Sequence, residues 1–286
     1  MGTSRHPDTL DKITWRVGLA GRKFFGRSPE LSWSVIALAM TPERFWERWR
    51  CAMRRVPPNT DSLSVVRREG PLVLWGSRFG PVWARYTDGP AIWAEVDEVM
   101  DRRAYDLPPV SVREGDVVVD AGANLGGFTR FALRRWAKKV IAFEHDQARL
   151  EGLRKTFARE IAAGSVEVVA AAGQGGNGHA ATQAAEDATP EAWALKIDDA
   201  LDELGVEHVD FIKINWRGSE RHALAGAART IRRSRPRLAV CSRYLPDDAQ
   251  VLPQVVAEIL SSYKVLRRRD YLYYYCEQAP GGLRSR

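Results

Sequence analysis

The stretch of this sequence that most limits its possible folds runs from Val117 to Thr129 and reads V-V-V-D-A-G-A-N-L-G-G-F-T. Its β-branched start predicts a short buried strand, and the glycine-rich turn that follows predicts entry into a helix. Gly122 is expected to let the backbone approach a ligand, and Gly126 and Gly127 to let the turn close and the helix pack near the strand. Open α/β sheets bind ligands at such loops, at the carboxyl ends of their strands.

The spacing of this loop indicates which ligand it binds. A dinucleotide fingerprint would read G-x-G-x-x-G, but Asn124 replaces the middle glycine and Asp120 ends the strand. The pattern D-x-G-x-x-x-G suits a ligand with an amino-acid portion and no phosphate, such as S-adenosylmethionine (SAM). We expect Asp120 to take up the cationic end of that ligand, directly or through water, and the loop amides to hold its carboxylate.

A second apolar strand, residues 139–144, also ends in an acid, Glu144, 24 residues after Asp120. A carboxylate at this position can bind both ribose hydroxyls of a nucleoside. The residues predicted to bind the cofactor are Asp120, Gly122, Ala123, Asn124, Gly126, Glu144 and His145.

The charge of the chain is unevenly distributed. The net charge is +7, and residues 1–60 hold eleven Lys or Arg against five Asp or Glu, so the rest of the chain is close to neutral. This weakens a nucleic-acid-binding interpretation, and no nucleic-acid partner is expected. Three scattered cysteines without a C-x-x-C pair argue against a disulfide framework or a zinc site. We expect a cytoplasmic protein without a bound metal.

Residues 1–60 are predicted to form a basic helical extension. Ser28-Pro29-Glu30 and Thr41-Pro42-Glu43 each combine an N-cap residue, a proline in the first turn and an acid. The second helix carries aromatic residues at helical spacing with arginines around them. It either packs on the main domain or offers a basic amphipathic surface to a membrane or a protein partner. The longest apolar run here, residues 34–40, is too short to span a bilayer.

Residues 61–107 are predicted to form short antiparallel strands that lead into the core. Glycine-proline pairs interrupt residues 62–98, and Trp75, Trp83 and Trp93 are assigned to these strands. We interpret the tryptophans as packing residues, with stacking on a substrate as the alternative.

Residues 108–278 alternate between strand and helix patterns, which is typical of a parallel, doubly wound sheet. Besides the strand that begins at Val117, the patterns predict strands at 139–144, 166–171, 208–214, 237–242, 263–267 and 271–276. Helices are predicted at 126–137, 146–162, 198–204, 219–233 and 248–262.

Several motifs, in this order, resemble those of the FkbM family of SAM-dependent methyltransferases. The similarity covers roughly residues 95–275. The matching positions are Asp120, Gly122, Ala123, Asn124, Gly126, Glu144, Asp198-Asp199, Asp210-Phe211-Ile212-Lys213-Ile214, Gly218, Glu220, Leu224, Gly226, Ala227 and Pro236.

The resemblance implies an α/β, Rossmann-like class I methyltransferase fold. This fold has a seven-stranded, mostly parallel sheet with helices on both faces and an antiparallel last strand. The resemblance also implies SAM as cofactor and methylation of a hydroxyl on a small-molecule natural product or a glycan. It adds Ala172, beside the adenine, to the predicted cofactor site. The acceptor side is expected to include Asn215, Trp216, Arg217 and Glu220.

Three positions depart from the family pattern. Asn215 and Arg217 stand where the family has Asp and Glu, and Cys241 replaces an acid common at the end of the next strand. Asparagine takes up no proton, and arginine is no base at neutral pH. Arg217 suggests an acidic acceptor, such as a carboxylated or phosphorylated glycan.

The group that activates the acceptor is left open by the sequence. Candidates are His145 and His222, and the alternative interpretation of each is a surface histidine without a catalytic role. Lys213 is expected to pair with Asp210 or Glu220, and serves as a base only if burial lowers its pKa. The predicted catalytic set is therefore Lys213, Asn215, Glu220 and His222. Methyl transfer can also proceed largely by positioning, without a base.

Two other functions remain as alternatives. The lost acids are compatible with a SAM-binding protein that has lost catalysis and acts as an interaction or regulatory module. A nucleic-acid methyltransferase is the weaker alternative, because Asn215 does not begin the N-P-P-[YFW] loop of adenine N6 methylation.

Overall fold

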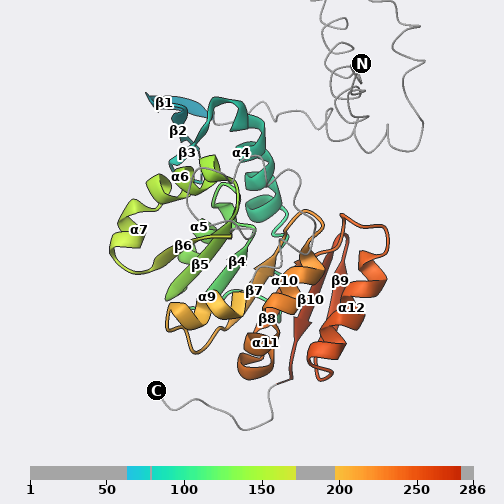
Figure 1. Cartoon of the computed structure of the whole chain (residues 1–286). Coiled ribbons are helices and arrows are strands. Elements are labelled where there is room, and N and C mark those ends of the chain that lie inside the picture. Colours follow the sequence, from blue (N-terminus) through green and yellow to red (C-terminus); the bar gives the residue numbers. More distant parts are fainter. Residues whose placement is uncertain (1–62, 78, 172–196, 278–286) are drawn as a thin grey trace, which may run out of the picture. The chain divides into compact units, whose positions relative to one another are not determined.

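A seven-stranded sheet forms the centre of the part of the chain that the computed structural model describes, residues 63–77, 79–171 and 197–277 (Figure 1). Its strands are β4 (Val117–Ala121), β5 (Lys139–Glu144), β6 (Val166–Ala170), β7 (Phe211–Ile214), β8 (Arg237–Cys241), β9 (Lys264–Arg268) and β10 (Tyr271–Tyr275). Their order is β6-β5-β4-β7-β8-β10-β9. Strands β4 to β8 run parallel, and β10 runs antiparallel to both β8 and β9. The expected fold, including the antiparallel last strand, is confirmed.

Helices cover both faces of this sheet (Figure 1). On one face lie α9 (Ile197–Glu203), α10 (Glu220–Gly226), α11 (Ala228–Ser234) and α12 (Asp248–Ile259). On the other lie α5 (Gly127–Arg134), α6 (Gln147–Thr156) and α7 (Ala158–Ala162). The predicted helices 146–162 and 219–233 are each divided in two, near Phe157 and Ala227.

The alternation of side chains along β4 assigns its residues to these two layers. Val119 and Ala121 pack with α9–α12, whereas Val118 packs with α5. Asp120 therefore points to the α5 side, because successive side chains on a strand point to opposite faces. Lys213 on β7 is the register partner of Asp120 and points to the same side.

The segment before the sheet differs in part from its prediction. It forms β1 (Ser64–Glu69), β2 (Leu72–Gly76) and β3 (Val82–Arg85), which make an antiparallel sheet, followed by η1 (Tyr86–Asp88), α4 (Gly89–Val96) and the π-helical turn η2 (Asp97–Asp101). Trp75 and Trp83 lie in strands as expected, but the assignment of Trp93 to a strand is wrong, because it lies in α4. Pro90 begins a helix here, and Ile92, Val96 and Val99 are buried at helical spacing.

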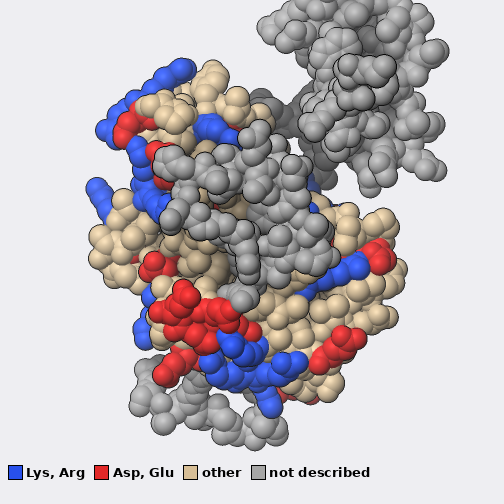
Figure 2. Space-filling model, viewed as in Figure 1, with Lys and Arg blue, Asp and Glu red and all other residues tan. Residues whose placement is uncertain are grey.

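Acidic and basic side chains lie side by side on the surface of the sheet domain. Figure 2 shows acidic groups over α9 beside basic groups over α11. Arg229 of α11 forms ion pairs with Asp198, Asp199 and Asp202 of α9. The exposed members of this cluster are expected to add at most about 1 kcal/mol each.

Some predictions fall on residues that the structure does not describe. These are the helical extension 1–60 and Ala172. Within residues 63–77, 79–171 and 197–277, no helix is both long and apolar enough to cross a membrane.

Candidate functional site

The glycine loop after β4 is shaped by contacts within the protein. Gly122 has a φ of +82°, and a Cβ at this position would lie 2.1 Å from the carbonyl oxygen of Asn215. The backbone after β7 therefore occupies the space that a Cβ of Gly122 would need, and the approach of a ligand to this glycine stays a prediction. Gly126 has a φ of +88°, and a Cβ there would lie 2.4 Å from the ring of Phe157. The close contact of Gly126 is therefore with the end of α6, and its expected role in packing α5 near β4 stays a prediction.

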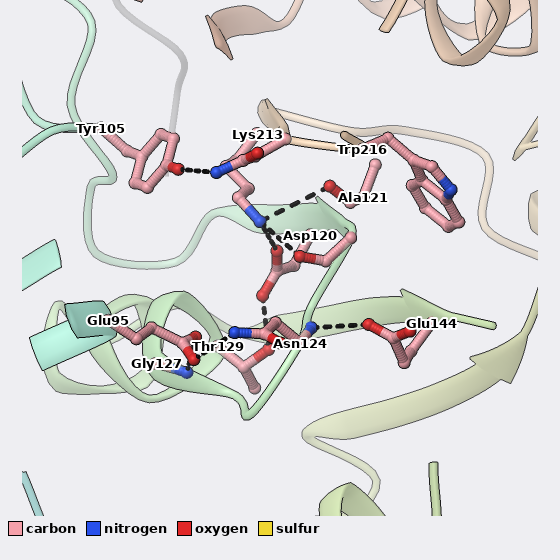
Figure 3. Close-up of polar contacts among 12 residues, drawn as sticks. Glu95, Tyr105, Asp120, Ala121, Asn124, Gly127, Thr129, Glu144, Lys213 and Trp216 are labelled. Carbon is pink, nitrogen blue, oxygen red and sulfur yellow. Dashed lines mark hydrogen bonds and ion pairs between the residues drawn. The ribbon is translucent and has the colours of Figure 1, made fainter. Parts of the chain in front are cut away.

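A buried ion pair joins the neighbouring strands β4 and β7 next to this loop (Figure 3). The Nζ of Lys213 lies 2.9 Å from Oδ1 of Asp120, and it also donates to the carbonyl oxygen of Gly122 at 2.7 Å. Asp120 is fully buried, and its Oδ2 accepts a hydrogen bond from Thr129. Lys213 thus pairs with Asp120, not with Asp210 or Glu220 as expected. The cation that Asp120 holds in this structure is Lys213.

Asn124 connects two carboxylates on either side of the loop (Figure 3). Its backbone N–H donates to Oε2 of Glu144 at 2.8 Å, and its side-chain Nδ2 donates to Oε2 of Glu95 at 2.8 Å. Its φ is +54°, in the left-handed region that asparagine tolerates better than most residues. Its side-chain Oδ1 is buried and accepts no hydrogen bond from any described residue.

Glu95 of α4 reaches the loop from outside the sheet. Its carboxylate accepts hydrogen bonds from the backbone N–H groups of Gly127, at 2.7 Å, and of Leu125, at 3.3 Å. Loop amides expected to hold the carboxylate of the ligand therefore bind Glu95. Burial raises the pKa of Glu95 to about 7, against the opposing effects of the Gly127 N–H and the positive charge of Lys213.

Glu144 ends β5 as expected and is buried. It accepts hydrogen bonds from the backbone N–H groups of Asn124, His145 and Asp146. An ionised carboxylate has roughly four acceptor positions, so about one remains for a hydroxyl. The His145 ring lies next to that of Trp216, with 6.1 Å between the centroids.

A second polar network surrounds Glu98 of η2. Its Oε1 accepts hydrogen bonds from the hydroxyls of Tyr105 and Tyr271, and it forms an ion pair with Arg243. These charged and polar partners hold the pKa of Glu98 below its usual value despite burial, chiefly through Arg243. Asn215 continues the network, since its Nδ2 donates to Tyr105 at 2.6 Å and its Oδ1 accepts from Tyr244 at 3.0 Å.

These groups border a cavity of about 170 Å³ at the carboxyl ends of β4 and β7. Gly122, Asn124, Lys213, Asn215 and Arg217 line it, as expected of the two predicted binding regions. Its other described lining residues are Ala91, Ala94, Glu95, Glu98, Val99, Tyr105, Phe128 and Tyr244. Asp120, Glu144, Trp216 and Glu220 are not among the described residues that border it.

Glu220 holds the turn after β7. It is fully buried and accepts hydrogen bonds from the backbone N–H groups of Trp216, at 2.8 Å, and Gly218, at 2.9 Å. These bonds fix the turn that presents Arg217, whose φ is +50°. Glu220 thus positions Arg217. His222 lies two residues further along α10 and is not a described lining residue of the cavity.

The family of the chain follows from a domain comparison. The methyltransferase FkbM domain matches residues 120–273, which is more than half of the chain. This protein is a member of the FkbM methyltransferase family. The match begins at Asp120, so the glycine loop, Glu144 and the Lys213 region belong to the family domain, whereas Glu95, Glu98 and Tyr105 precede it.

Solved structures with a similar fold include further methyltransferases. The FkbM methyltransferase from Methylobacillus flagellatus KT has 24% identity and a TM-score of 0.43, covering 56% of this chain and 44% of its own. The chain thus spans less than half the length of that relative. Precorrin-6y C5,15-methyltransferase from Geobacter metallireducens GS-15 has 13% identity and a TM-score of 0.39, covering 61% of this chain and 85% of its own. The Methanococcus jannaschii fibrillarin pre-rRNA processing protein has 12% identity and a TM-score of 0.39, covering 75% and 96%. No curated protein matches the chain.

The described acids that line the cavity come from the segment before the FkbM domain. Of the three positions that depart from the family pattern, Asn215 forms hydrogen bonds with two tyrosines, and Arg217 is exposed at the cavity. Cys241 is buried, and its sulfur lies 3.2 Å from Nε of Arg243. The acids at the cavity are Glu95 and Glu98 among the described residues. The helical spacing of Ile92, Val96 and Val99 would have placed both acids on a helix. The prediction from sequence missed this because it assigned the segment to strands. No group of three or more His, Cys, Asp or Glu in the described parts of the chain could hold a metal ion.

We expect Asn215→Asp to destabilise this FkbM protein. The hydroxyl of Tyr105 already donates to Glu98, so an aspartate would face its oxygen without receiving a hydrogen bond. The expected loss in the free energy of unfolding is about 1–3 kcal/mol at pH 8. Urea unfolding measures it. The effect should largely disappear in a Tyr105→Phe background, and an equal loss there would contradict this explanation.

Proposed function

We propose that this FkbM-family protein transfers the methyl group of SAM to a hydroxyl oxygen on a natural product or glycan. The observation that carries the proposal is the cavity that the family's glycine loop and the end of β7 line together. Ligands of open α/β sheets bind at this edge, outside the carboxyl ends of the strands.

The residues at this edge fit the parts of SAM. Glu144 would accept a hydrogen bond from a ribose hydroxyl, and Asn124, with its unsatisfied Oδ1, would contact the amino-acid part. The cavity of about 170 Å³ is smaller than the roughly 300–1,000 Å³ of whole-ligand pockets, so it would receive only part of the cofactor and acceptor. SAM supplies an activated methyl group on a sulfonium.

The chain itself contributes positioning on the acceptor side. Asn215, Tyr244 and Arg217 border the cavity, and hydrogen bonds fix the first two. Lys213 is held by Asp120 and two backbone carbonyls, which makes it a structural cation. Catalysis would then depend mainly on holding the acceptor in line with the methyl group.

We further propose that the acceptor is acidic. Arg217 is exposed at the cavity and forms no ion pair with another described residue. A carboxylate or phosphate on the acceptor would supply one. A screen of paired acidic and neutral glycans tests this, and a preference for the neutral members would exclude it.

A SAM-binding protein without catalysis is the second candidate. It is favoured by the replacement of acids at Asn215, Arg217 and Cys241. Both candidates bind SAM, and only the enzyme forms S-adenosylhomocysteine together with a methylated acceptor.

Calorimetric titration with SAM is expected to show saturable binding to the whole chain. SAM at 100 times its Kd should stabilise the fold by about 2.7 kcal/mol, which thermal unfolding detects. Glu144→Gln is expected to weaken binding about tenfold, because one of the hydrogen bonds to a charged group is lost.

Glu151→Gln is the matched control, because Glu151 is an exposed acid on the neighbouring helix α6. Its affinity for SAM should equal that of the unmodified protein. Absence of binding heat and of thermal stabilisation in the unmodified chain would refute the proposed function.

A further inference from the structure

Two of the charged groups at the cavity have a partner of opposite charge, whereas the buried acid Glu95 has none among the described residues. Lys213 is neutralised by Asp120, and Glu98 by Arg243. Glu95 is also buried, yet its hydrogen-bond donors are neutral amides, and no described cation lies within 4 Å of its carboxylate. A buried carboxylate without a cationic partner is costly, and a ligand cation would offset this cost.

A second unsatisfied acceptor lies next to Glu95. Asn124 directs its Nδ2 to the Glu95 carboxylate, which fixes the orientation of the amide and leaves Oδ1 on the opposite side of the amide. This Oδ1 is buried and receives no hydrogen bond from the described residues. Asn124 and Glu95 both line the cavity, so it offers a carboxylate and an amide oxygen to one ligand.

We propose that Glu95 and Oδ1 of Asn124 bind the ammonium group of the amino-acid part of SAM. This inference rests on the proposed function and assigns its cation site to a residue that precedes the family domain. An ammonium has three N–H donors and no acceptor, so it can donate to both the Glu95 carboxylate and Oδ1 of Asn124. Asp120, the acid expected in this role, is fully buried and already holds Lys213.

Binding of this ammonium is coupled to the protonation of Glu95. Its pKa is about 7 without ligand, raised by burial and by the negative charges of Asp120 and Glu98, and lowered by Lys213 and the Gly127 N–H. A bound ammonium favours the ionised carboxylate, so ligand binding below pH 7 must release a proton. The affinity should then fall by up to about tenfold per pH unit below pH 7.

Calorimetry with two ligands tests this on the whole chain. S-adenosylhomocysteine has the ammonium, whereas 5′-methylthioadenosine has the nucleoside and thioether but no amino-acid part. At pH 6, in buffers of different ionisation enthalpy, the first is expected to release close to one proton and the second none. Glu95→Gln should weaken S-adenosylhomocysteine about tenfold to a hundredfold, abolish its proton release and leave 5′-methylthioadenosine within about twofold.

Asp97→Asn is the matched control, because Asp97 lies two residues away and pairs with Arg102. It should change neither ligand. Equal weakening of both ligands by Glu95→Gln would show that Glu95 only supports the glycine loop, and would overturn the inference. If the unmodified chain binds S-adenosylhomocysteine at pH 6 without releasing a proton, the inference is also overturned. If neither ligand nor SAM binds the unmodified chain, the proposed function itself fails.

Discussion

Gly122→Ala is expected to lower the free energy of unfolding by about 2–5 kcal/mol. The new Cβ would lie 2.1 Å from the carbonyl oxygen of Asn215, and backbone atoms on both sides must shift to relieve this contact. Overpacking of this kind costs about 1–3 kcal/mol. The positive φ of +82° adds about 1–2 kcal/mol for a residue with a Cβ. Urea unfolding monitored by circular dichroism measures the sum.

Gly115→Ala separates these two contributions. Gly115 has nearly the same φ, +81°, but nothing lies within 4 Å of the position that a Cβ would take there. Its replacement should therefore cost only about 1–2 kcal/mol. If both variants lose the same stability, the close approach of Asn215 does not constrain position 122, and the described packing of β4 against β7 is wrong.

Lys213→Met is expected to cost about 3–5 kcal/mol. Methionine keeps much of the apolar stem but removes the ammonium, which leaves the carboxylate of Asp120 buried without a cation. Removing one member of a buried ion pair has a cost of about this size. Thermal and urea unfolding of the variant would show it.

The double variant Asp120→Asn/Lys213→Met should be more stable than Lys213→Met alone. It leaves no uncompensated charge at positions 120 and 213, and the asparagine can still accept the hydrogen bond from Thr129. Lys264→Met is the exposed control, because Lys264 and its partner Glu277 are each more than half exposed, and its loss should stay near or below about 1 kcal/mol. A Lys213→Met protein as stable as this control would contradict the assignment of Lys213 as a structural cation.

The positions of the acids explain why the site is only partly predictable. Asp120, Glu144 and Lys213 lie at strand ends as predicted, since β-branched runs and glycine turns are local signals. Their partners differ from the prediction, because the partner of Lys213 is set by the register between β4 and β7, 93 residues apart. The prediction from sequence missed Glu95 because it interpreted a Gly-Pro pair as a turn between strands. In the structure this proline lies in the first turn of α4.

The sequence by itself determined the strand–loop–helix units, the seven-stranded sheet and the membership of residues 120–273 in the FkbM family. The strand–loop–helix units depend on residue patterns within a short window of the chain, whereas the sheet and the family follow from several motifs that occur in order along it. Only the tertiary structure decided that Lys213 forms an ion pair with Asp120 and that Glu95 lines the cavity without a cationic partner. The physical reason is that the charge state and hydrogen bonding of a buried group depend on what distant segments bring next to it.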